Sequence, residues 1–429
     1  MTQYEHHFLD RVIRQSVRAS TISFFVVVLS ASFGVAMTLG SSFLLLLSSL
    51  VFIIRHRVSL NFSRIEWAGL ALLAVLVARA AIEVRLDGFI HILNEYRLLW
   101  MVPIISVAVA KCFEQREIIG IILVSSLIYI VGSSLMVVFG DPFEIIVYKR
   151  DVQHFVGPYL SLGGKFVHGL WAAAVTALGL AIVNKLESNV SRIGVCVAVA
   201  YIFGYSLIIE ESRTGYVMFA AVGVLIVWKS QLSRLQLSRI GLAVAISVIA
   251  LSIMESSVRS QLILSINTLS EVMSGRNMDA TSIGQRLLAW KALSSLSIQE
   301  LFLGLGPFEA QIRIDQWIEE GLLLGEPARG KNLHSDIAHL VLSGGLVAVF
   351  CYGLFAWAVF RVIKQHPCRP SSPTHGAILG LAIAVFVICF VSGVANSTLL
   401  DVRERHVVMV FFVAFVALLR QEIWFSEHV

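Results

Sequence analysis

Long apolar runs separated by short polar segments dominate the chain between residues 20 and 420. A helix needs about 20 mostly apolar residues to cross a bilayer, and most of these runs reach or approach that length. The pattern therefore predicts an all-α, polytopic integral membrane protein with about 12 spanning helices. The predicted spans are a helical hairpin in 20–54 and single helices near 66–82, 96–111, 118–139, 166–184, 193–209, 214–228, 240–254, 336–360, 376–394 and 407–420.

Two local features of these runs predict bends in the backbone. The run 20–54 is too long for one span, and Gly40, Ser41 and Ser42 lie near its middle. Because Gly and Ser favour turns, we expect the hairpin to turn there. Pro103 is the only proline inside a predicted span, and a proline inside a helix removes a backbone hydrogen bond, so it predicts a kink at that position.

The segment 255–335 is expected to form one long external loop with its own structure. Apolar residues recur at three- and four-residue spacing in 258–272 and in 283–293. This spacing predicts two amphipathic helices that lie on or against the membrane face. The Gly-x-Gly-Pro sequence at 304–307 predicts a turn, and 317–324 predicts a third short helix.

On this basis the chain divides into five segments. The first segment, residues 1–19, carries both acidic and basic residues before any apolar run. It therefore does not resemble a cleavable signal peptide. The segments are a cytoplasmic lead-in at 1–19, the first nine spans at 20–254, the large external loop at 255–335, the last three spans at 336–420 and a cytoplasmic tail at 421–429.

The composition supports this interpretation. Hydrophobic residues make up 57% of the chain and charged residues 14%, whereas soluble proteins carry about 25% charged residues. These values exclude a soluble enzyme of several domains, a disordered chain and a nucleic-acid-binding protein. The five cysteines are scattered without a CxxC pair, which argues against a disulfide framework and against a zinc or iron–sulfur site.

The basic residues predict the orientation. With the N-terminus inside, 17 of the 33 Lys and Arg residues fall in short cytoplasmic segments, nine in short external loops and seven in the long external loop. Since cytoplasmic loops carry an excess of Lys and Arg, both termini are expected in the cytoplasm. The nine external residues indicate either an anionic external ligand or pairing with nearby acids. They are Arg79, Arg85, Arg97, Lys149, Arg150, Lys165, Arg213, Arg403 and Arg405.

Three external arginines are candidate anion ligands. Arg213 begins a predicted span within Glu211-Ser212-Arg213-Thr214-Gly215. A guanidinium there can bind a phosphate with two hydrogen bonds, and the helix N-terminus adds positive potential. A salt bridge to a neighbouring glutamate is the plainer alternative. Arg276 and Arg286 lie in the long loop. The alternative for this pair is an arginine that lies beside an apolar helix face and reaches the membrane interface, since the spacing would be the same.

One histidine is a candidate base. His334 lies in Asn332-Leu333-His334-Ser335-Asp336, at the boundary between the long loop and the next span. A helix N-terminus and neighbouring arginines would keep its imidazole neutral and able to accept a proton. A histidine at a membrane interface can equally be a polar anchor. His339 lies five residues further on, off the same helix face, so no metal site is expected here.

Three motifs occur in order along the chain. They are Ser212-Arg213-Thr214-Gly215, then Arg286-Leu287-Leu288-Ala289-Trp290 with Leu303-Gly304-Leu305-Gly306-Pro307, and then His334-Ser335 followed after nine residues by Gly345. With these motifs, over roughly 210–350, the chain resembles the bacterial O-antigen ligases and, more broadly, the O-antigen ligase/polymerase superfamily. The ligase signature continues Gly-x-x-[Gly/Thr/Val], and here Ala348 stands at the last position, a small residue in place of another.

The resemblance implies a GT-C-like membrane glycosyltransferase in the bacterial inner membrane, with a periplasmic loop that closes a lateral cavity. The implied donor is a polysaccharide on undecaprenyl diphosphate, and the implied acceptor is a sugar hydroxyl of lipid A–core, in lipopolysaccharide biosynthesis. By position, Arg213 and Arg286 would bind the diphosphate, with Arg276 as a further candidate, and His334 would be catalytic. Because two arginines can neutralise the leaving group, no metal or cofactor is expected. Attack from the side opposite the diphosphate would invert the anomeric carbon.

Other functions remain open from the sequence. A polymerase of the same superfamily would share the donor and use a second lipid-linked glycan as acceptor. A lipid-linked oligosaccharide flippase would also need external arginines, but it needs no base and should carry charges along an internal path. A protein-glycosylating oligosaccharyltransferase is a further alternative. The single long loop and the His-Ser signature favour the ligase.

Overall fold

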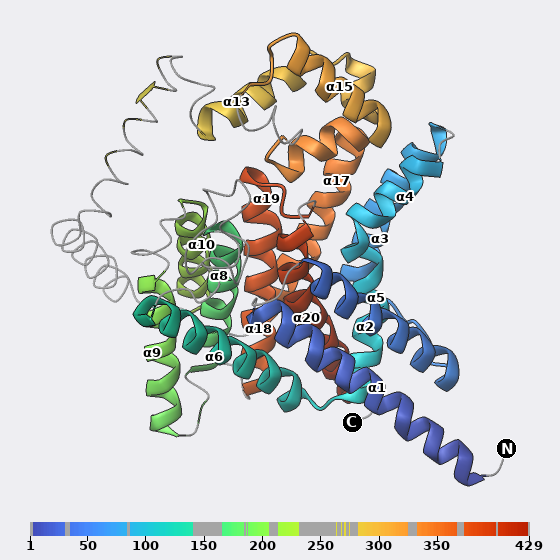
Figure 1. The fold of residues 1–429 in the computed structure, drawn as a ribbon, viewed down its shortest axis with the longest axis vertical. Helices are drawn as coiled ribbons and strands as arrows, with labels where there is room; N and C mark the ends of the chain where they lie inside the picture. The colour runs from blue at the N-terminus through green and yellow to red at the C-terminus, as the bar shows by residue number, and fades with distance from the viewer. Residues whose placement is uncertain are drawn as a thin grey trace.

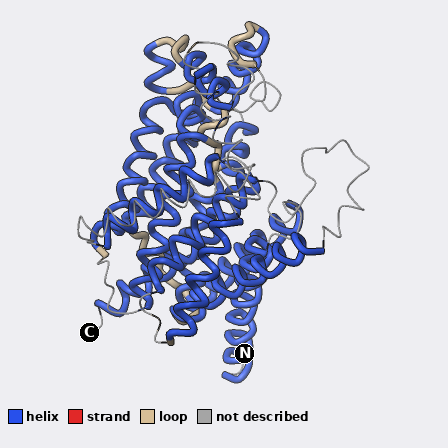
Figure 2. Tube along the Cα trace, turned by 90° about the vertical axis from the view of Figure 1, so that its left-hand side faces the viewer, coloured by secondary structure: helices blue, strands red, loops and turns tan. Residues whose placement is uncertain are grey.

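The computed structural model describes residues 3–30, 35–83, 86–139, 165–183, 189–205, 213–230, 282–324, 333–366, 373–399 and 402–427, with isolated positions in 186–188 and 263–274. Every regular element among these residues is a helix (Figure 2). They are α1 (Gln3–Ser30), α2 (Val35–His56), α3 (Arg64–Ile82), α4 (Leu86–Glu95), α5 (Arg97–Cys112), α6 (Gln115–Phe139), α8 (Lys165–Ile182), α9 (Asn189–Tyr205), α10 (Arg213–Ser230), α13 (Ser282–Leu293), α14 (Ile298–Leu303), α15 (Pro307–Glu319), α17 (Asp336–Gln365), α18 (Pro373–Phe386), the π-helix η3 (Val387–Val391), α19 (Ser392–Ala395) and α20 (Val402–Glu427).

The long helices pack into a bundle with α18 and α20 near its centre (Figure 1). α20 packs against α5 and α18, α18 packs against α8, and α17 packs against α3. Residues 405–421 of α20 are all buried, as expected for its stretch 407–419, which is apolar on all sides. Peripheral helices instead expose large apolar side chains, such as Ile54 in α2 and Ile193 in α9, which suits contact with lipid.

Five helices among the described residues are long and apolar enough to cross a membrane, and a sixth span results if α4 and α5 count as one bent pair. α8, α9 and α10 contain shorter apolar helices. The predicted span at 240–254 lies outside the described residues. The prediction of a polytopic helical membrane protein is confirmed, whereas the number of about 12 spans and the GT-C-like class stay predictions.

The first hairpin forms, but its turn lies elsewhere than predicted. α1 ends at Ser30, α2 begins at Val35, and the two helices pack against each other. Gly40, Ser41 and Ser42 lie inside α2, where the Ser42 hydroxyl donates to the carbonyl oxygen of Leu39 at 2.9 Å. This local hydrogen bond lets a serine stay in a helix, so the predicted turn at 40–42 is wrong.

A bend that the sequence did not predict lies between α4 and α5. The chain bends by 54° there, at Tyr96, whereas Pro103 lies within α5. Arg405 of α20 donates hydrogen bonds to the carbonyl oxygens of Asn94 and Glu95, at the end of α4. The bend therefore forms where a buried side-chain donor takes the carbonyls that end a helix, and the kink at Pro103 stays a prediction.

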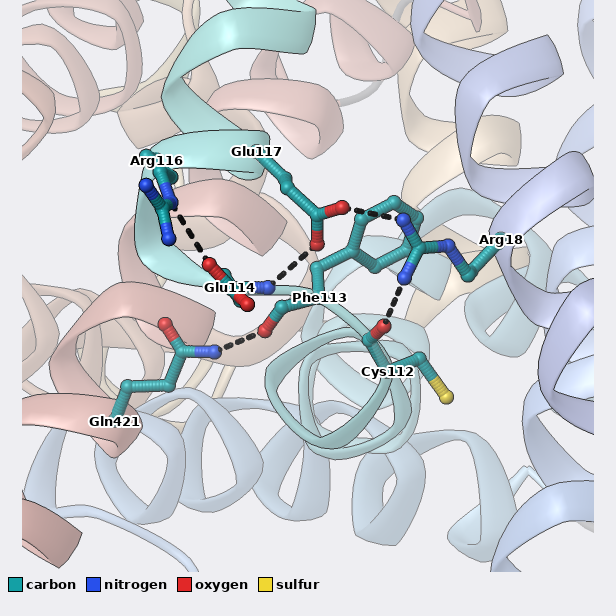
Figure 3. A network of polar contacts seen from close by, with 7 residues as sticks. All are labelled: Arg18, Cys112, Phe113, Glu114, Arg116, Glu117 and Gln421. Atoms are coloured by element: carbon teal, nitrogen blue, oxygen red, sulfur yellow. Dashed lines mark hydrogen bonds and ion pairs between the residues drawn. The ribbon is translucent and has the colours of Figure 1, made fainter.

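The ends of the bundle differ in what they carry. α13 and α15 lie at one end, and the N-terminal end of α1 and the C-terminal end of α20 lie at the other (Figures 1 and 2). At the end with the chain termini, the corner between α5 and α6 is held by side chains from distant helices (Figure 3). Gln421 donates to the carbonyl oxygen of Phe113 at 2.6 Å, and Arg18 pairs with Glu117 and donates to the carbonyl oxygen of Cys112 at 3.2 Å.

A buried ion pair lies toward the same end. Arg420 Nη2 and Glu66 Oε1 are 2.6 Å apart, and both side chains are almost fully buried. Glu66 also completes a capping box with Ser63 at the start of α3. The pair ties α20 to α3 inside the bundle, at the ends of the predicted spans 66–82 and 407–420.

Candidate active site

The predicted amphipathic helix at 283–293 forms as α13, and it buries an alanine-rich face that the spacing alone did not indicate. Ala289, Ala292 and Leu293 pack into a small core with α15 and the start of α17. Leu287 and Trp290, two of the apolar residues at the predicted spacing, are 43% and 39% exposed, so the predicted contact of this stripe with the membrane face stays a prediction. Tertiary packing selects the alanine-rich face because small side chains allow α13 to approach its neighbours closely.

The third predicted helix of the loop is shifted toward the N-terminus. The turn at 304–306 forms as predicted, with φ values of +73° at Gly304 and +94° at Gly306. α15 then begins at Pro307 and ends at Glu319, so the predicted helix at 317–324 is wrong. Proline suits the first position of a helix, because its missing N–H would have no helical partner there.

The Gly-x-Gly turn docks into a break in α17. Gly345 has φ +67° and ψ −168°, which interrupts the helix. Leu305 N donates to the carbonyl oxygen of Leu342 at 2.8 Å, and Gly306 N donates to that of Ser343 at 2.9 Å. A Cβ atom at Gly345 would lie 2.2 Å from a carbonyl oxygen of α14. The turn at 304–306 and Gly345, the glycine of the third motif, therefore contact each other directly.

The end of α3 fastens this turn from the other side. Arg79 Nη2 donates to the carbonyl oxygen of Gly304 at 2.8 Å. The Glu83 carboxylate accepts hydrogen bonds from the backbone N–H groups of Phe308 and Glu309, at 3.2 and 3.1 Å. A carboxylate at a helix N-terminus is stabilised by the helix dipole, so α3 holds the start of α15 in place.

His334 lies at a strained corner next to this contact. Its φ of +51° is in the left-handed region that residues with a Cβ rarely adopt. The corner is fixed on both sides, since Leu333 N donates to His339 Nε2 at 3.0 Å and the Ser335 hydroxyl accepts from Ala338 N at 3.3 Å. Strain of this kind persists only where surrounding contacts over-determine it, and it is typical of functional sites.

Asn396, which follows α19, connects this corner to α13. Its backbone oxygen accepts from Asp336 N at 3.1 Å. Its side-chain oxygen accepts from Arg286 Nη2 at 3.2 Å. The Asp336 carboxylate in turn accepts from Leu399 N at 3.1 Å. Two of the predicted site residues, Arg286 and His334, are therefore brought to one place by a segment that the sequence analysis did not single out.

Arg213 begins α10 at the same end of the bundle. Trp228, near the end of α10, stacks on Phe360, near the end of α17, with ring centroids 5.6 Å apart. α10 also packs against η3 and α19, and α19 leads to Asn396, which bonds to the first residue of α17. α10 and α17 therefore run in the same direction, and the helix that starts at Arg213 starts on the side of His334.

Two of the candidate anion ligands fall wholly or partly outside the described residues. The side chain of Arg213 and the whole of Arg276 lie outside the described residues. Within the described parts of the chain, no three His, Cys, Asp or Glu side chains are grouped as they would be to hold a metal ion.

The segment after the π-helix is the part of the site that sequence reasoning missed. π-helices are rare and often occur at functional sites, but η3 lies in the uniformly apolar run 376–394, which reads as an ordinary span. Ser392 and Thr398 are buried and their hydroxyl oxygens are 2.6 Å apart, which closes the turn that presents Asn396. A polar Asn-Ser-Thr sequence directly after an apolar run was the available signal.

Comparison with known proteins agrees with the motifs. Residues 197–353 match the family model described as O-antigen ligase. No curated protein matches the chain. The matched residues include Arg213, Arg286, His334 and Gly345, and they end before Asn396. This match supports the expected membership in the O-antigen ligase/polymerase superfamily.

Proposed function

We propose that this protein is an O-antigen ligase of the bacterial inner membrane. It would transfer a polysaccharide from undecaprenyl diphosphate to a sugar hydroxyl of lipid A–core at the periplasmic face. The observation that carries the proposal is the connection from Arg286 through Asn396 to Asp336, two residues from His334. It joins a candidate anion-binding side chain to a candidate base, in a chain whose residues 197–353 match the O-antigen ligase family model.

The proposed chemistry is direct displacement at the anomeric carbon. The acceptor oxygen forms the new bond to that carbon, the bond from the carbon to the phosphate oxygen breaks, and the acceptor proton passes to the His334 imidazole. A positioned base of this kind contributes about 10²–10⁴-fold to a rate. Attack from the side opposite the diphosphate inverts the anomeric configuration.

The arginines would stabilise the leaving group. Charge grows on the diphosphate as the bond breaks, and preorganised cations stabilise that charge. Arg286 would bind it directly, and Arg213 would bind it from the start of α10, where the helix N-terminus also favours an anion. The proposed transfer is metal-independent, so activity should persist in excess EDTA; loss of activity that Mg²⁺ restores would reject this part.

The depth of the site supports a membrane-linked substrate. α17 has an uncharged stretch at 340–360, which spans about 30 Å at about 1.5 Å per residue and so matches the hydrocarbon core of a bilayer. His334 precedes this stretch by six residues. The corner would therefore lie at the level of the lipid headgroups, where the diphosphate of a polyprenyl-linked donor lies.

Reconstitution of the purified protein in liposomes tests the function. The liposomes contain a lipid-linked glycan and either lipid A–core or additional donor as the acceptor. The proposal expects a product of donor length attached to lipid A–core. A longer glycan on undecaprenyl diphosphate would instead identify a polymerase, and movement of unchanged donor across the bilayer would identify a flippase.

A further inference from the structure

The short helix α14 carries an exposed apolar side next to the candidate site. The side chains of Ile298, Phe302 and Leu303 are 88%, 57% and 41% exposed. Because successive residues of a helix are rotated by about 100°, these three lie on one side, together with the exposed Gln299. Glu300 lies on the opposite side, where it forms an ion pair with α15. The side of α14 that faces away from the protein is therefore mainly apolar.

The contact with α17 places this side at the depth of lipid acyl chains. A Cβ atom at Gly345 would lie 2.2 Å from the carbonyl oxygen of Phe302, so the end of α14 is level with Gly345. Gly345 lies five residues inside the uncharged stretch 340–360, which matches the hydrocarbon core in length. At about 1.5 Å per residue, this is about 7 Å inside the edge of that stretch. An exposed phenylalanine at this depth faces lipid.

The exposed side of α17 begins where α14 docks. Leu346, Phe350, Leu354 and Trp357 are all exposed. Their spacing of three and four residues puts them on one side of α17, as expected for a spanning helix that contacts lipid. Leu346 directly follows Gly345 in the sequence, so the lipid-facing side of α17 starts next to the end of α14.

The backbone around α14 is satisfied by protein groups, as an apolar surrounding requires. Ser297 and Glu300 form a capping box at its start, and Gly304 N donates to the carbonyl oxygen of Glu300 at 2.8 Å. Leu305 N and Gly306 N donate to carbonyl oxygens of α17. Irregular backbone is tolerated at membrane depth only where protein groups satisfy its hydrogen bonds, and the turn after α14 meets this condition.

We propose that α14 inserts its apolar side into the acyl layer of the membrane leaflet at the end of the bundle that carries α13 and α15. The partner of this surface is bulk phospholipid. Insertion holds the segment between α13 and α17 at a fixed depth in the bilayer, as it does for other helices with one apolar side. This anchoring goes beyond the proposed function and holds whether or not the protein transfers a glycan.

Spin-label measurements on the full chain in phosphatidylcholine nanodiscs test the proposal. Replacing Cys196 and Cys368 by serine leaves three cysteines, all buried, and this background variant measures residual labelling. A nitroxide is then attached at Phe302→Cys, at Phe350→Cys as the lipid reference, or at the exposed Glu319→Cys as the water reference.

Collisions of the nitroxide with two reagents report its surroundings. Oxygen concentrates in the acyl layer, whereas a polar nickel chelate stays in water. The ratio of oxygen to nickel collisions at position 302 should approach the ratio at 350 and exceed the ratio at 319 several-fold. If Phe302→Cys does not fold, Ile298→Cys on the same side of α14 takes its place.

Three outcomes of this measurement would overturn the proposal. A label at 302 that meets the nickel chelate as often as a label at 319 faces water. A label at 302 that is shielded from both reagents is covered by protein, either a second copy or another part of this chain. Oxygen access that is lost at 302 and kept at 350 when undecaprenyl diphosphate is added would assign the surface to the tail of that lipid.

A polar substitution gives a second, independent test. In water, glutamine in place of an exposed phenylalanine changes stability little. In the acyl layer the amide loses its hydrogen bonds with water, so limited proteolysis of the loop in Phe302→Gln should be about 5–30-fold faster than in the wild type. Phe302→Leu keeps an apolar side chain and should be cleaved at the wild-type rate. Proteolysis of Phe302→Gln at the wild-type rate would contradict insertion.

Discussion

The two ends of the bundle use their arginines differently. At the end that carries the chain termini, Arg420 pairs with the Glu66 carboxylate at 2.6 Å, and Arg18 pairs with that of Glu117. At the end that carries α13–α15, Arg313 also pairs with a carboxylate, that of Glu300, at 2.7 Å, but Arg79 donates to the carbonyl oxygen of Gly304 and Arg286 donates to an amide oxygen. The ion pairs tie helices together at both ends. The contacts of Arg79 and Arg286 with neutral oxygens orient two further guanidinium groups at the second end.

The backbone differs in the same way. At the first end α3 begins with a regular capping box at Ser63, which satisfies its terminal N–H groups. At the second end His334, Gly304 and Gly345 all have positive φ, and a π-helix precedes the turn at Asn396. The first end also has one residue with positive φ, Arg57 (φ +49°), but it is exposed in the connection between α2 and α3. The positive-φ positions at the second end are held by many contacts, which marks the candidate site.

The largest expected effect is on catalysis at His334. His334→Ala should lower turnover by about 10²–10⁴-fold, because the acceptor hydroxyl loses its base. Binding of undecaprenyl diphosphate should stay normal, and wild-type activity should fall in acid as the imidazole takes up a proton. His334→Gln distinguishes a catalytic base from a residue that only positions the substrate. An amide can donate a hydrogen bond but cannot accept the proton. An active Gln variant whose rate does not fall in acid would contradict the role of a base.

Breaking the buried ion pair at the other end should affect stability and leave the chemistry intact. Arg420→Ala should lower the free energy of unfolding by about 3–5 kcal/mol, because the Glu66 carboxylate stays buried without its partner. Denaturant unfolding in detergent measures this change. Arg116→Ala removes an exposed partner of Glu114 and is the matched control, which should leave the unfolding midpoint unchanged. A normal unfolding midpoint in Arg420→Ala would contradict a structural role for the pair.

Removing an arginine at the end with the candidate site should weaken donor use and leave stability almost unchanged. Arg286→Ala and Arg213→Ala should each weaken donor use by about 10–100-fold, since a charge-assisted hydrogen bond contributes about 1.5–3 kcal/mol. Stability should change little. Lysine should rescue only in part, because it lacks the planar fork of the guanidinium. Full turnover with lysine at both positions would rule out two-point binding of the diphosphate.

The docking of the loop onto α17 is tested by two glycines of the same helix. Gly345→Ala should lower the free energy of unfolding by about 1–3 kcal/mol, because alanine is strained at its φ of +67° and would meet the backbone of α14. Gly353 has open space around its position, so Gly353→Ala should be neutral or slightly stabilising. Equal melting temperatures for the two variants would contradict the docking.

The smallest effect is expected within the loop itself. Hydrogen bonds from the backbone and side chain of Ser297, followed by Arg313, lower the pKa of Glu300. Because the pKa of Glu300 is lowered, its ionised carboxylate stabilises the fold at pH values above the usual carboxyl range. This stabilisation is lost as the pH falls through the lowered pKa. Glu300→Gln should lower the stability of the loop by about 0–1 kcal/mol, because the Glu300–Arg313 pair is partly exposed. The rate of proteolysis in the loop at neutral and at acidic pH measures this change. A Glu300→Gln variant whose proteolysis depends on pH as in the wild type would contradict the prediction.

The sequence predicted the class of fold because apolar runs of spanning length leave few alternatives. It also found the residues that carry local chemical signals, which are Arg213 at a helix start, Arg286 beside an apolar stripe and His334 at a span boundary. It did not predict the turn of the first hairpin, the bend at Tyr96 or the buried face of α13, because long-range contacts decide these features.

Asn396 shows the same limit within the site. Its role depends on a contact with Arg286 across 110 positions of sequence, and on a π-helix that has no distinctive composition. The missed capping box at Ser297 is different, because Ser-x-x-Glu before an apolar helix is a local signal that can be read directly.

The central claim of the proposed function is that Arg286 binds the diphosphate of the donor close to a base at His334. The most direct measurement compares binding of undecaprenyl diphosphate and of undecaprenol to the wild-type protein and to Arg286→Ala in nanodiscs. The account predicts that the wild type prefers the diphosphate by at least about ten-fold and that Arg286→Ala loses most of this preference. Equal affinity of the wild type for the two lipids, or an unchanged preference in Arg286→Ala, would contradict it.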